Sequence, residues 1–393
     1  MTDASHQPST LPTSQNPTYI GLVAPLPPPS GGMANQARQL RRLLEAEGVS
    51  VDIVQVNAPY QPAWVGQLRG IRALFRLVPF IFRLWSTAGR VQLFHVMANS
   101  GMSWHLFAAP AIMIGAMRGI PVIVNYRGGE ADTFFQKSIG RIRKNLERAA
   151  ILVVPSGFLE AVFKKYELSS VIVPNIIDLE KFSSHTTNDV SNTTDAHITD
   201  AHILVSRNLE PIYDIGTVVR AFAHVKAQLP NAQLTVAGSG PELAALEKLA
   251  AELGVSDAVN FTGRVENEKM AALYHSADVM VNPSLVDNMP ISVLESLASS
   301  VPVVSTNVGG VPYLVEDGKT ALLVDAQDHH AMAKSILAIL QDDALAERLK
   351  TEGLKSVIQY SWPEVRERWF AVYRNALAPQ KPSRSGINGQ RNA

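Results

Sequence analysis

Short runs of aliphatic and β-branched residues recur along the whole chain and most strongly limit how it can fold. Six runs stand in the first half of the sequence, at 19–25, 50–56, 92–98, 121–127, 151–156 and 171–175. Six more stand in the second half, at 202–207, 233–238, 259–263, 279–284, 302–307 and 321–324. The runs are continuously apolar, which is typical of parallel strands covered by helices on both faces. They predict an α/β protein with two doubly wound, Rossmann-like domains.

Polar stretches divide the chain around these runs. We expect a disordered leader at 1–17, a first domain at 18–182, a linker or insertion at 183–201, a second domain at 202–360, a single helix at 361–378 and a disordered tail at 379–393. Histidines in the linker raise the question of a metal site, but a flexible linker is the favoured interpretation. In the last helix, Ser361 is the expected N-cap and Pro363 belongs to the first turn.

The composition excludes several classes of function. Thirty-five basic side chains balance thirty-five acidic ones, which gives no general argument for nucleic-acid binding. The chain has no cysteine, so disulfides, thiolate metal sites and cysteine nucleophiles are excluded. The polar N-terminus does not resemble a secretory signal, and no apolar run is long enough to span a bilayer. We expect a cytoplasmic protein.

One segment, 64–90, raises the question of membrane contact. It carries five arginines and several large aromatic residues but no acid, and Pro79 is expected to kink or divide its helix. Arginines 69, 72, 76 and 83 recur at helical spacings. Either this basic face lies on the inner face of an anionic membrane, or it is a solvated edge of the domain. The pattern alone leaves both interpretations open.

The stretch 284-SLVDNMPISVLESLA-298 predicts the start of a helix beside a strand end. Pro290 suits the first helical position, because its missing N–H would have no partner there, and Asn288 or Met289 would be the cap. The amides of Ile291 and Ser292 would then point out of the helix and could bind a phosphate oxygen.

Two acids flank this predicted anion site. Asp287 precedes the helix, and Glu295 lies about one and a half turns inside it. Carboxylates accept hydrogen bonds from both hydroxyls of a diol, such as a ribose or a hexose. The apolar surroundings of Glu295 argue against a merely solvated charge.

A second candidate phosphate site follows the first predicted strand. Its loop ends in Gly31 and Gly32, directly before an amphipathic helix, and glycines there would let a ligand approach the backbone. The loop lacks the G-x-G-x-x-G fingerprint of dinucleotide-binding proteins. A plain tight turn remains an equal alternative.

Taken together, the motifs resemble those of the retaining nucleotide-sugar glycosyltransferases of family 4, which have two facing doubly wound domains, the GT-B type. The matching pieces of the second half are 237-AGSGPE-242, 261-FTGRV-265, 279-VMVNPS-284, Asp287, Glu295, 302-PVVST-306, 309-GGVP-312 and 316-EDGKTALLV-324. Those of the first half are 31-GG-32, 120-IPVIVNYRGGE-130 and 173-VPNIIDLEKF-182. The resemblance covers nearly the whole chain apart from the tails and the linker.

This resemblance implies roles for individual residues. Glu295 would hold the ribose of the nucleotide, Asp287 the hydroxyls of the transferred sugar, and Arg207 the pyrophosphate. The neighbours of the bound donor would be Gly31 and Gly32 at the phosphates, Gly263, Arg264 and Val265 at the base, and Asn288, Met289, Pro290, Ile291 and Ser292 at the helix start. The resemblance also implies that the last helix crosses back to the first domain.

The implied reaction is the metal-independent transfer of a hexose-type sugar, with retention, from a nucleotide-sugar donor to a polysaccharide or lipid-linked acceptor. No cofactor and no nucleic-acid partner are expected. Two alternatives stay open: a relative that binds sugar nucleotides but has lost transfer, and a sugar-nucleotide epimerase on the same fold.

The sequence departs from the family pattern at the expected cationic positions. Arg127 stands where many members have a histidine, and no lysine follows Arg207 at the usual distance. We expect Arg127 to supply the missing positive charge. His95 and His105, near strand ends of the first domain, are either acceptor contacts or structural histidines, with the structural role favoured.

Overall fold

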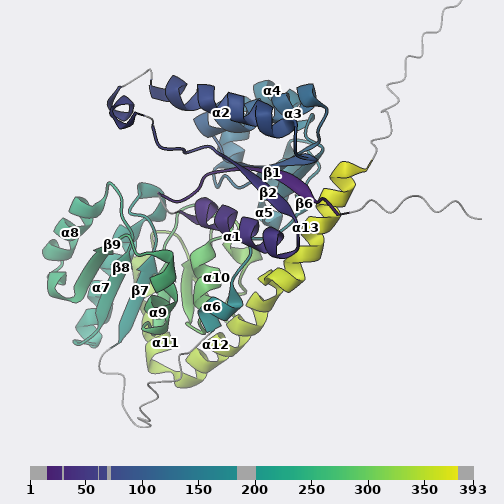
Figure 1. Ribbon diagram of the computed structural model, residues 1–393. Coiled ribbons are helices and arrows are strands. Elements are labelled where there is room, and N and C mark those ends of the chain that lie inside the picture. Colours follow the sequence, from purple (N-terminus) through teal and green to yellow (C-terminus); the bar gives the residue numbers. More distant parts are fainter. Residues whose placement is uncertain (1–15, 29–30, 61, 69–71, 184–200, 379–393) are drawn as a thin grey trace, which may run out of the picture.

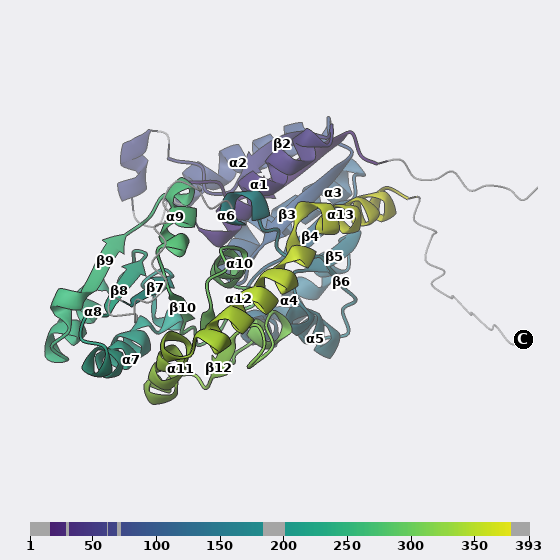
Figure 2. The ribbon, with the colours of Figure 1, turned by 90° about the horizontal axis from the view of Figure 1, so that it is seen from below.

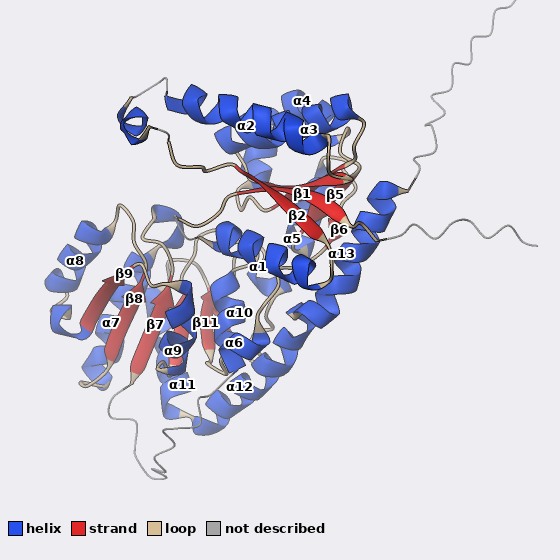
Figure 3. Ribbon diagram, viewed as in Figure 1, coloured by secondary structure: helices blue, strands red, loops and turns tan. Residues whose placement is uncertain are grey.

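The computed structural model describes residues 16–28, 31–60, 62–68, 72–183 and 201–378. These residues form two lobes, and each lobe holds one sheet covered by helices (Figures 1 and 3). Both sheets have six strands and are parallel throughout, which confirms the predicted fold class. The predicted leader at 1–17, linker at 183–201 and tail at 379–393 lie almost wholly outside the described residues.

The first sheet has the strand order β2-β1-β3-β4-β5-β6. Its strands are β1 (Tyr19–Ala24), β2 (Ser50–Gln55), β3 (Leu93–Ala98), β4 (Val122–Tyr126), β5 (Ile151–Val154) and β6 (Val171–Ile172). Every residue of β3 and β4 is buried, as their continuously apolar sequences predict. The strand order reverses between β1 and β3, so a crevice is expected beyond the carboxyl ends of these two strands.

The second sheet has the order β12-β11-β10-β7-β8-β9. Its strands are β7 (His202–Ser206), β8 (Gln233–Ala237), β9 (Val259–Gly263), β10 (Val279–Asn282), β11 (Val303–Thr306) and β12 (Leu322–Val324). Here the order reverses between β7 and β10. The loop that contains Arg207 and the loop that contains Asp287 therefore leave the sheet side by side.

Helices cover both faces of each sheet (Figure 3). They are α1 (Gly32–Ala46), α2 (Arg72–Ala88), α3 (Ala109–Arg118), α4 (Ala131–Leu146), α5 (Gly157–Lys165), α6 (Leu179–Ser183), α7 (Ile215–Gln228), α8 (Leu243–Glu252), α9 (Met270–His275), α10 (Ile291–Ala298), α11 (His329–Gln341), α12 (Asp343–Val357) and α13 (Trp362–Leu377). The short helical turns are η1 (Ala63–Gln67), η2 (Trp104–Ala108), η3 (Pro211–Tyr213), η4 (Ser256–Ala258), η5 (Asn267–Lys269), η6 (Val311–Tyr313) and η7 (Ile358–Tyr360).

The last helix, α13, leaves the second lobe and lies against the first (Figures 1 and 2). Its buried residues Trp369 and Tyr373 belong to the same apolar cluster as Ile20 and Leu22 of β1. At its start, the indole of Trp362 donates a hydrogen bond of 3.0 Å to Glu47 at the end of α1. The predicted crossing of the final helix is confirmed.

Pro79 was expected to kink or divide its helix, and the structure shows that it does not divide it. It lies inside α2, which runs without interruption from Arg72 to Ala88. Pro79 is exposed, so the carbonyl that loses its hydrogen bond there can be hydrated instead. Among the described residues, no helix has the length and apolar composition needed to cross a membrane.

Candidate active site

The loops at the two points of strand reversal open onto one cleft of about 490 Å³ between the lobes. From the first lobe come the residues after β1, β3 and β4, among them Gly31, Ser100 and Arg127. From the second lobe come those after β7 and β10, among them Arg207 and Asp287. The parallel topology thus places loops that are distant in sequence at one site.

The helix predicted to start at Pro290 in fact starts one residue later. Pro290 is the N-cap of α10, with φ −62° and ψ 116°, and Ile291 is the first helical residue. Neither Asn288 nor Met289 is the cap, because the extended backbone of Pro290 already marks the end of the loop. The free amides that open the helix still include those of Ile291 and Ser292.

Ser292 adds a hydroxyl group to this helix start. Its side chain is buried and lines the cleft, and its Oγ has no hydrogen-bond partner among the described residues. A buried hydroxyl without a partner is costly unless a bound group satisfies it. Together with the helix amides, Ser292 forms a set of donors suited to an anion.

Glu295 lies in the cleft with its carboxylate partly withdrawn from water. Tyr274 of α9 donates a hydrogen bond of 3.0 Å to its Oε2. Burial raises the pKa of the Glu295 carboxyl from 4.5 to about 7, although the hydrogen bond from Tyr274 and the charges of Lys181 and Arg207 act in the opposite direction. The carboxylate therefore titrates near neutrality and gains from any ligand that donates hydrogen bonds to it.

Arg207 and Asp287 form an ion pair with each other, which the sequence did not predict. Both side chains are 12% exposed. The Nε of Arg207 also donates to Asn282 Oδ1 at 2.9 Å, and its guanidinium lies 4.9 Å from the ring centre of Tyr213. These contacts hold the guanidinium just after the end of β7, where Arg207 is one of the residues that line the cleft.

The loop that carries Asp287 is fixed from behind by close backbone packing. A Cβ atom on Gly309 would come within 2.1 Å of the Asp287 carbonyl, and one on Gly310 within 1.6 Å of the Asn288 carbonyl. The amide of Gly310 also donates to the Asp287 carbonyl at 2.9 Å. The 309-GGVP-312 motif is therefore needed to position the loop after β10.

Gly31 and Gly32, unlike Gly309 and Gly310, are not packed against other backbone atoms. Gly31 is the N-cap of α1, Gly32 begins the helix, and both line the cleft. A Cβ atom on either would meet nothing within 4 Å. Nothing in the described protein requires glycine there, so the space in front of them is available for a ligand.

Arg127 enters the cleft from the first lobe, at the end of β4. One Nη donates to Asn175 Oδ1, and Asn175 Nδ2 donates at 2.9 Å to the carbonyl of Met289 in the second lobe. Burial lowers the pKa of Arg127 to about 10, so it stays charged at neutral pH. Its Nε has no partner among the described residues. Arg127 is thus a partly buried cation whose Nε donor is unsatisfied.

The remaining predicted residues fall in different places. Arg264 and Val265 line the cleft with the others, whereas Gly263 ends β9 with φ 68° and is not among the lining residues. His95 is fully buried against α13, with Nδ1 3.0 Å from the Tyr373 hydroxyl. Burial lowers the pKa of His95 to about 3, which supports a structural and uncharged histidine.

Several residues that build the site were not found from the sequence. Tyr274 supports Glu295, Asn282 holds Arg207, and Asn175 orients Arg127. Across the cleft, the hydroxyl of Ser156 donates to Asn288 Oδ1 at 2.6 Å. Each residue acts through a long-range contact, so only the polar ends of the predicted strands at 151–156, 171–175 and 279–284 could have pointed to three of them.

Comparison with known proteins agrees with this geometry. The model of the family "Glycosyltransferase Family 4" matches residues 30–181, and that of "Glycosyl transferases group 1" matches residues 192–356. A D-inositol 3-phosphate glycosyltransferase of Corynebacterium urealyticum is 30% identical over 244 residues, which cover 58% of this chain and 58% of that protein. A GDP-mannose-dependent phosphatidylinositol monomannoside mannosyltransferase of Mycobacterium tuberculosis is 34% identical over 154 residues, or 37% of this chain and 40% of that protein. The match thus spans less than two thirds of the length of these relatives.

Solved structures share the fold over nearly the full length. A sucrose-phosphate synthase of Thermosynechococcus elongatus superposes with a TM-score of 0.70 at 22% identity, covering 92% of this chain and all of that one. An Anabaena protein solved in complex with UDP gives 0.68 at 15% identity, covering 90% of this chain and 99% of that one. With one family model on each lobe, the chain belongs to the family 4 glycosyltransferases of the GT-B fold.

Proposed function

We propose that the protein transfers a hexose-type sugar from a nucleoside diphosphate sugar to an acceptor, with retention of configuration. The start of α10 carries this proposal, because its free amides and the unpartnered Ser292 hydroxyl face the cleft that Gly31 and Gly32 also line. Such a set of donors is suited to a diphosphate. Glu295 lies just beyond it, where a carboxylate can accept both ribose hydroxyls.

Breaking the bond between sugar and diphosphate leaves negative charge on the phosphate. Arg207 and Arg127 line the cleft from opposite lobes, and preorganised cations at such a place stabilise the transition state. In this proposal Arg127 takes the place of the lysine that the sequence lacks. Asp287 holds Arg207 in the free protein and accepts hydrogen bonds from the hydroxyls of the transferred sugar. The departing phosphate receives the proton of the attacking acceptor hydroxyl.

A screen of donors tests this function. The relatives' names include GDP-mannose, and a similar structure was solved with UDP-glucose, so these two donors are tried first. A donor should raise the melting temperature of the parent and not of Glu295→Ala. It should also release nucleoside diphosphate slowly when no acceptor is present, and excess EDTA should leave that rate unchanged.

The same assay separates the alternatives. Binding without any release of nucleoside diphosphate, with or without added acceptors, would identify a relative that has lost transfer. An epimerised sugar still attached to its nucleotide would identify an epimerase. Failure of every common UDP and GDP sugar to bind would contradict the proposal itself.

The finer proposal for the acceptor is a polysaccharide or lipid-linked molecule at the inner face of a membrane. The solvent face of α2 exposes large apolar side chains along one side of the helix, namely Leu74, Phe75, Val78, Phe82 and Trp85. Met113 and Met117 of the neighbouring α3 are also exposed, and Arg118 lies 4.9 Å from the ring centre of Trp85. An exposed apolar face rimmed by arginine is typical of a membrane-binding surface.

The arginines of this segment are not equivalent. Arg76, one of those expected to face lipid, donates at 3.1 Å to the carbonyl of Ala58 and lies over the ring of Tyr60. It stabilises its own lobe, so its replacement would not report on lipid binding alone.

Phe82, which is 73% exposed, is the better probe. The variant Phe82→Asp should sediment less with anionic vesicles than the parent and keep its melting temperature. Glu160→Gln, at an exposed position of the same lobe, is the control. Equal sedimentation of Phe82→Asp and the parent would contradict membrane docking through α2.

A further inference from the structure

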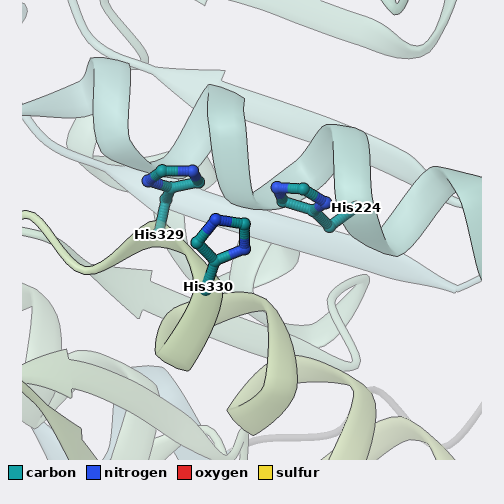
Figure 4. Close-up of side chains that lie close together, drawn as sticks. All are labelled: His224, His329 and His330. Carbon is teal, nitrogen blue, oxygen red and sulfur yellow. The ribbon is translucent and has the colours of Figure 1, made fainter.

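Three histidines of the second lobe come together on its surface, away from the cleft. His224 lies on α7, and His329 and His330 are the first two residues of α11 (Figure 4). Nitrogen atoms of the three rings, one from each, all lie within 4.8 Å of one another. None of the three lines the cleft, so the proposed transfer of sugar gives them no role.

The scaffold under this cluster is rigid. Helices α7 and α11 lie side by side, and the buried side chains of Phe222 and Ile336 belong to the same apolar cluster. The side chain of Asp328 caps α11 by accepting a hydrogen bond of 2.8 Å from the amide of Ala331. The backbone positions of the three histidines are therefore fixed, and only side-chain rotation separates them from closer contact.

The imidazole nitrogens are open to a ligand. Within the described ranges, none of the three rings hydrogen-bonds to another group, and they contact one another instead, with ring centres 4.2–5.5 Å apart. His224 and His330 are exposed, and His329 is partly exposed. Partial burial, together with the charges of His330 and His224, lowers the pKa of His329.

We propose that His224, His329 and His330 bind one Zn²⁺ or a similar borderline transition metal on the surface of the second lobe. Imidazole is a good ligand for zinc, copper and nickel, whereas Mg²⁺ and Ca²⁺ prefer oxygen. Three histidines fill three positions of a tetrahedral zinc and leave the fourth for water or an outside ligand. Zn–N bonds of about 2.0–2.1 Å require the rings to turn inward from their present spacing.

Two charges oppose a cation at this place. The start of α11 carries the positive end of the helix dipole, and Arg220 lies close enough to lower the pKa of His329. The carboxylate of Asp328 offsets part of this effect, and the exposed position lets solvent screen the rest. Coordination by three imidazoles is the stronger interaction, so the site binds metal more weakly than an enclosed four-ligand site.

The location suggests what the metal does. It joins the middle of α7 to the start of α11, two segments separated by about a hundred residues in sequence. Two of the three ligands, His224 and His330, also line a groove of about 440 Å³ together with Lys334 and Gln341. Bound metal stabilises the second lobe, and the groove gives an outside ligand access to it.

The test uses the full chain without an affinity tag, first stripped of metal by a chelator. Zn²⁺ is titrated against the protein by calorimetry, and melting temperatures are measured with Zn²⁺ and with Mg²⁺. We expect one Zn²⁺ per chain and a rise in melting temperature that Mg²⁺ does not produce. Each of the variants His224→Gln, His329→Gln and His330→Gln should weaken binding at least about tenfold.

The control is His105→Gln, an exposed histidine of the first lobe, which should bind zinc like the parent. Exposed histidines tolerate glutamine, and equal melting temperatures without metal check that the variants are folded. X-ray absorption of the zinc complex should show three imidazole ligands. No saturable binding, or binding that survives all three replacements, would overturn the proposal.

Discussion

The phenol of Tyr274 donates a hydrogen bond of 3.0 Å to the carboxylate of Glu295, and so links α9 to the helix at the centre of the cleft. Glu295 is surrounded by buried residues of α10, which makes its negative charge costly. Tyr274 lowers that cost and also fixes the direction of the carboxylate. The contact therefore bears on both the stability of the protein and its affinity for a ribose.

The variant Tyr274→Phe should bind the donor more weakly at neutral pH. The hydrogen bond from Tyr274 lowers the pKa of Glu295, so its loss raises that pKa above about 7 and leaves more of the carboxyl protonated. We expect a loss of about five- to tenfold in donor affinity at pH 7, recovered in part at pH 9. Measuring the donor affinity of Tyr274→Phe and of the parent from pH 7 to pH 9 checks this prediction. An affinity of the variant that is equally weak at both pH values would contradict it.

The variant Glu295→Gln should lose donor binding but be more stable than the parent at neutral and alkaline pH. The carboxyl has a pKa of about 7 in the folded protein and 4.5 when unfolded, so the folded protein retains a proton between these values. The free energy of unfolding of the parent therefore falls as the pH rises from 4.5 through 7. Glutamine has no such dependence.

Denaturant unfolding at two pH values measures this effect. Relative to the parent, Glu295→Gln should gain about 1–3 kcal/mol between pH 4.5 and pH 8. Donor binding should be lost at both pH values. A stability difference that does not change with pH would show that the carboxylate is better solvated than its surroundings indicate.

Replacing Arg127 by alanine should reduce transfer more than it weakens donor binding. A cation that stabilises the leaving phosphate acts mainly in the transition state, and its loss costs about 10²–10³ in kcat. Arg127→Lys should recover part of the rate, because it restores the charge but not the planar fork. Asn175→Ala is a useful comparison with Arg127→Ala, because it removes the side chain that orients Arg127 but leaves the positive charge in place. Unchanged kcat in Arg127→Ala would remove Arg127 from the mechanism.

Gly31→Ala should weaken donor binding without destabilising the fold. The added methyl group meets no protein atom within 4 Å, but it occupies space in front of the helix start. We expect at least about a tenfold rise in KM for the donor, since the phosphate can no longer reach the backbone. The matched control is Gly140→Ala in α4, where a methyl group also has open space and lies away from the cleft. Gly31→Ala should melt like the parent, and Gly140→Ala should melt no lower than the parent, because alanine is favoured over glycine inside a helix.

The sequence predicted the elements of this fold well, because buried parallel strands are continuous apolar runs. All twelve predicted runs contain a strand. The start of α10 was predicted to within one residue, since a proline before an apolar helical pattern leaves few alternatives. The resemblance to a known family then placed Arg207, Asp287 and Glu295 at one site, and the strand order explains why they meet.

What the sequence did not reveal depends on contacts between distant segments. The ion pair between Arg207 and Asp287 joins residues eighty positions apart, and nothing in either local sequence indicates it. The contact of Arg127 with Asn175 is of the same kind. The cluster of histidines at 224, 329 and 330 could not be predicted from the sequence, because their proximity follows from the packing of α7 on α11.

The position of helix α13 determines when the first lobe can complete its fold during synthesis. Its residues Trp369 and Tyr373 complete the apolar cluster under β1, and the phenol of Tyr373 contacts the buried His95. During synthesis, the ribosome delivers the first lobe well before this helix. The first lobe must therefore remain incomplete, with an apolar face of its sheet uncovered, until the second lobe has been translated. The segment that is made first therefore cannot complete its core before the last helix has been made.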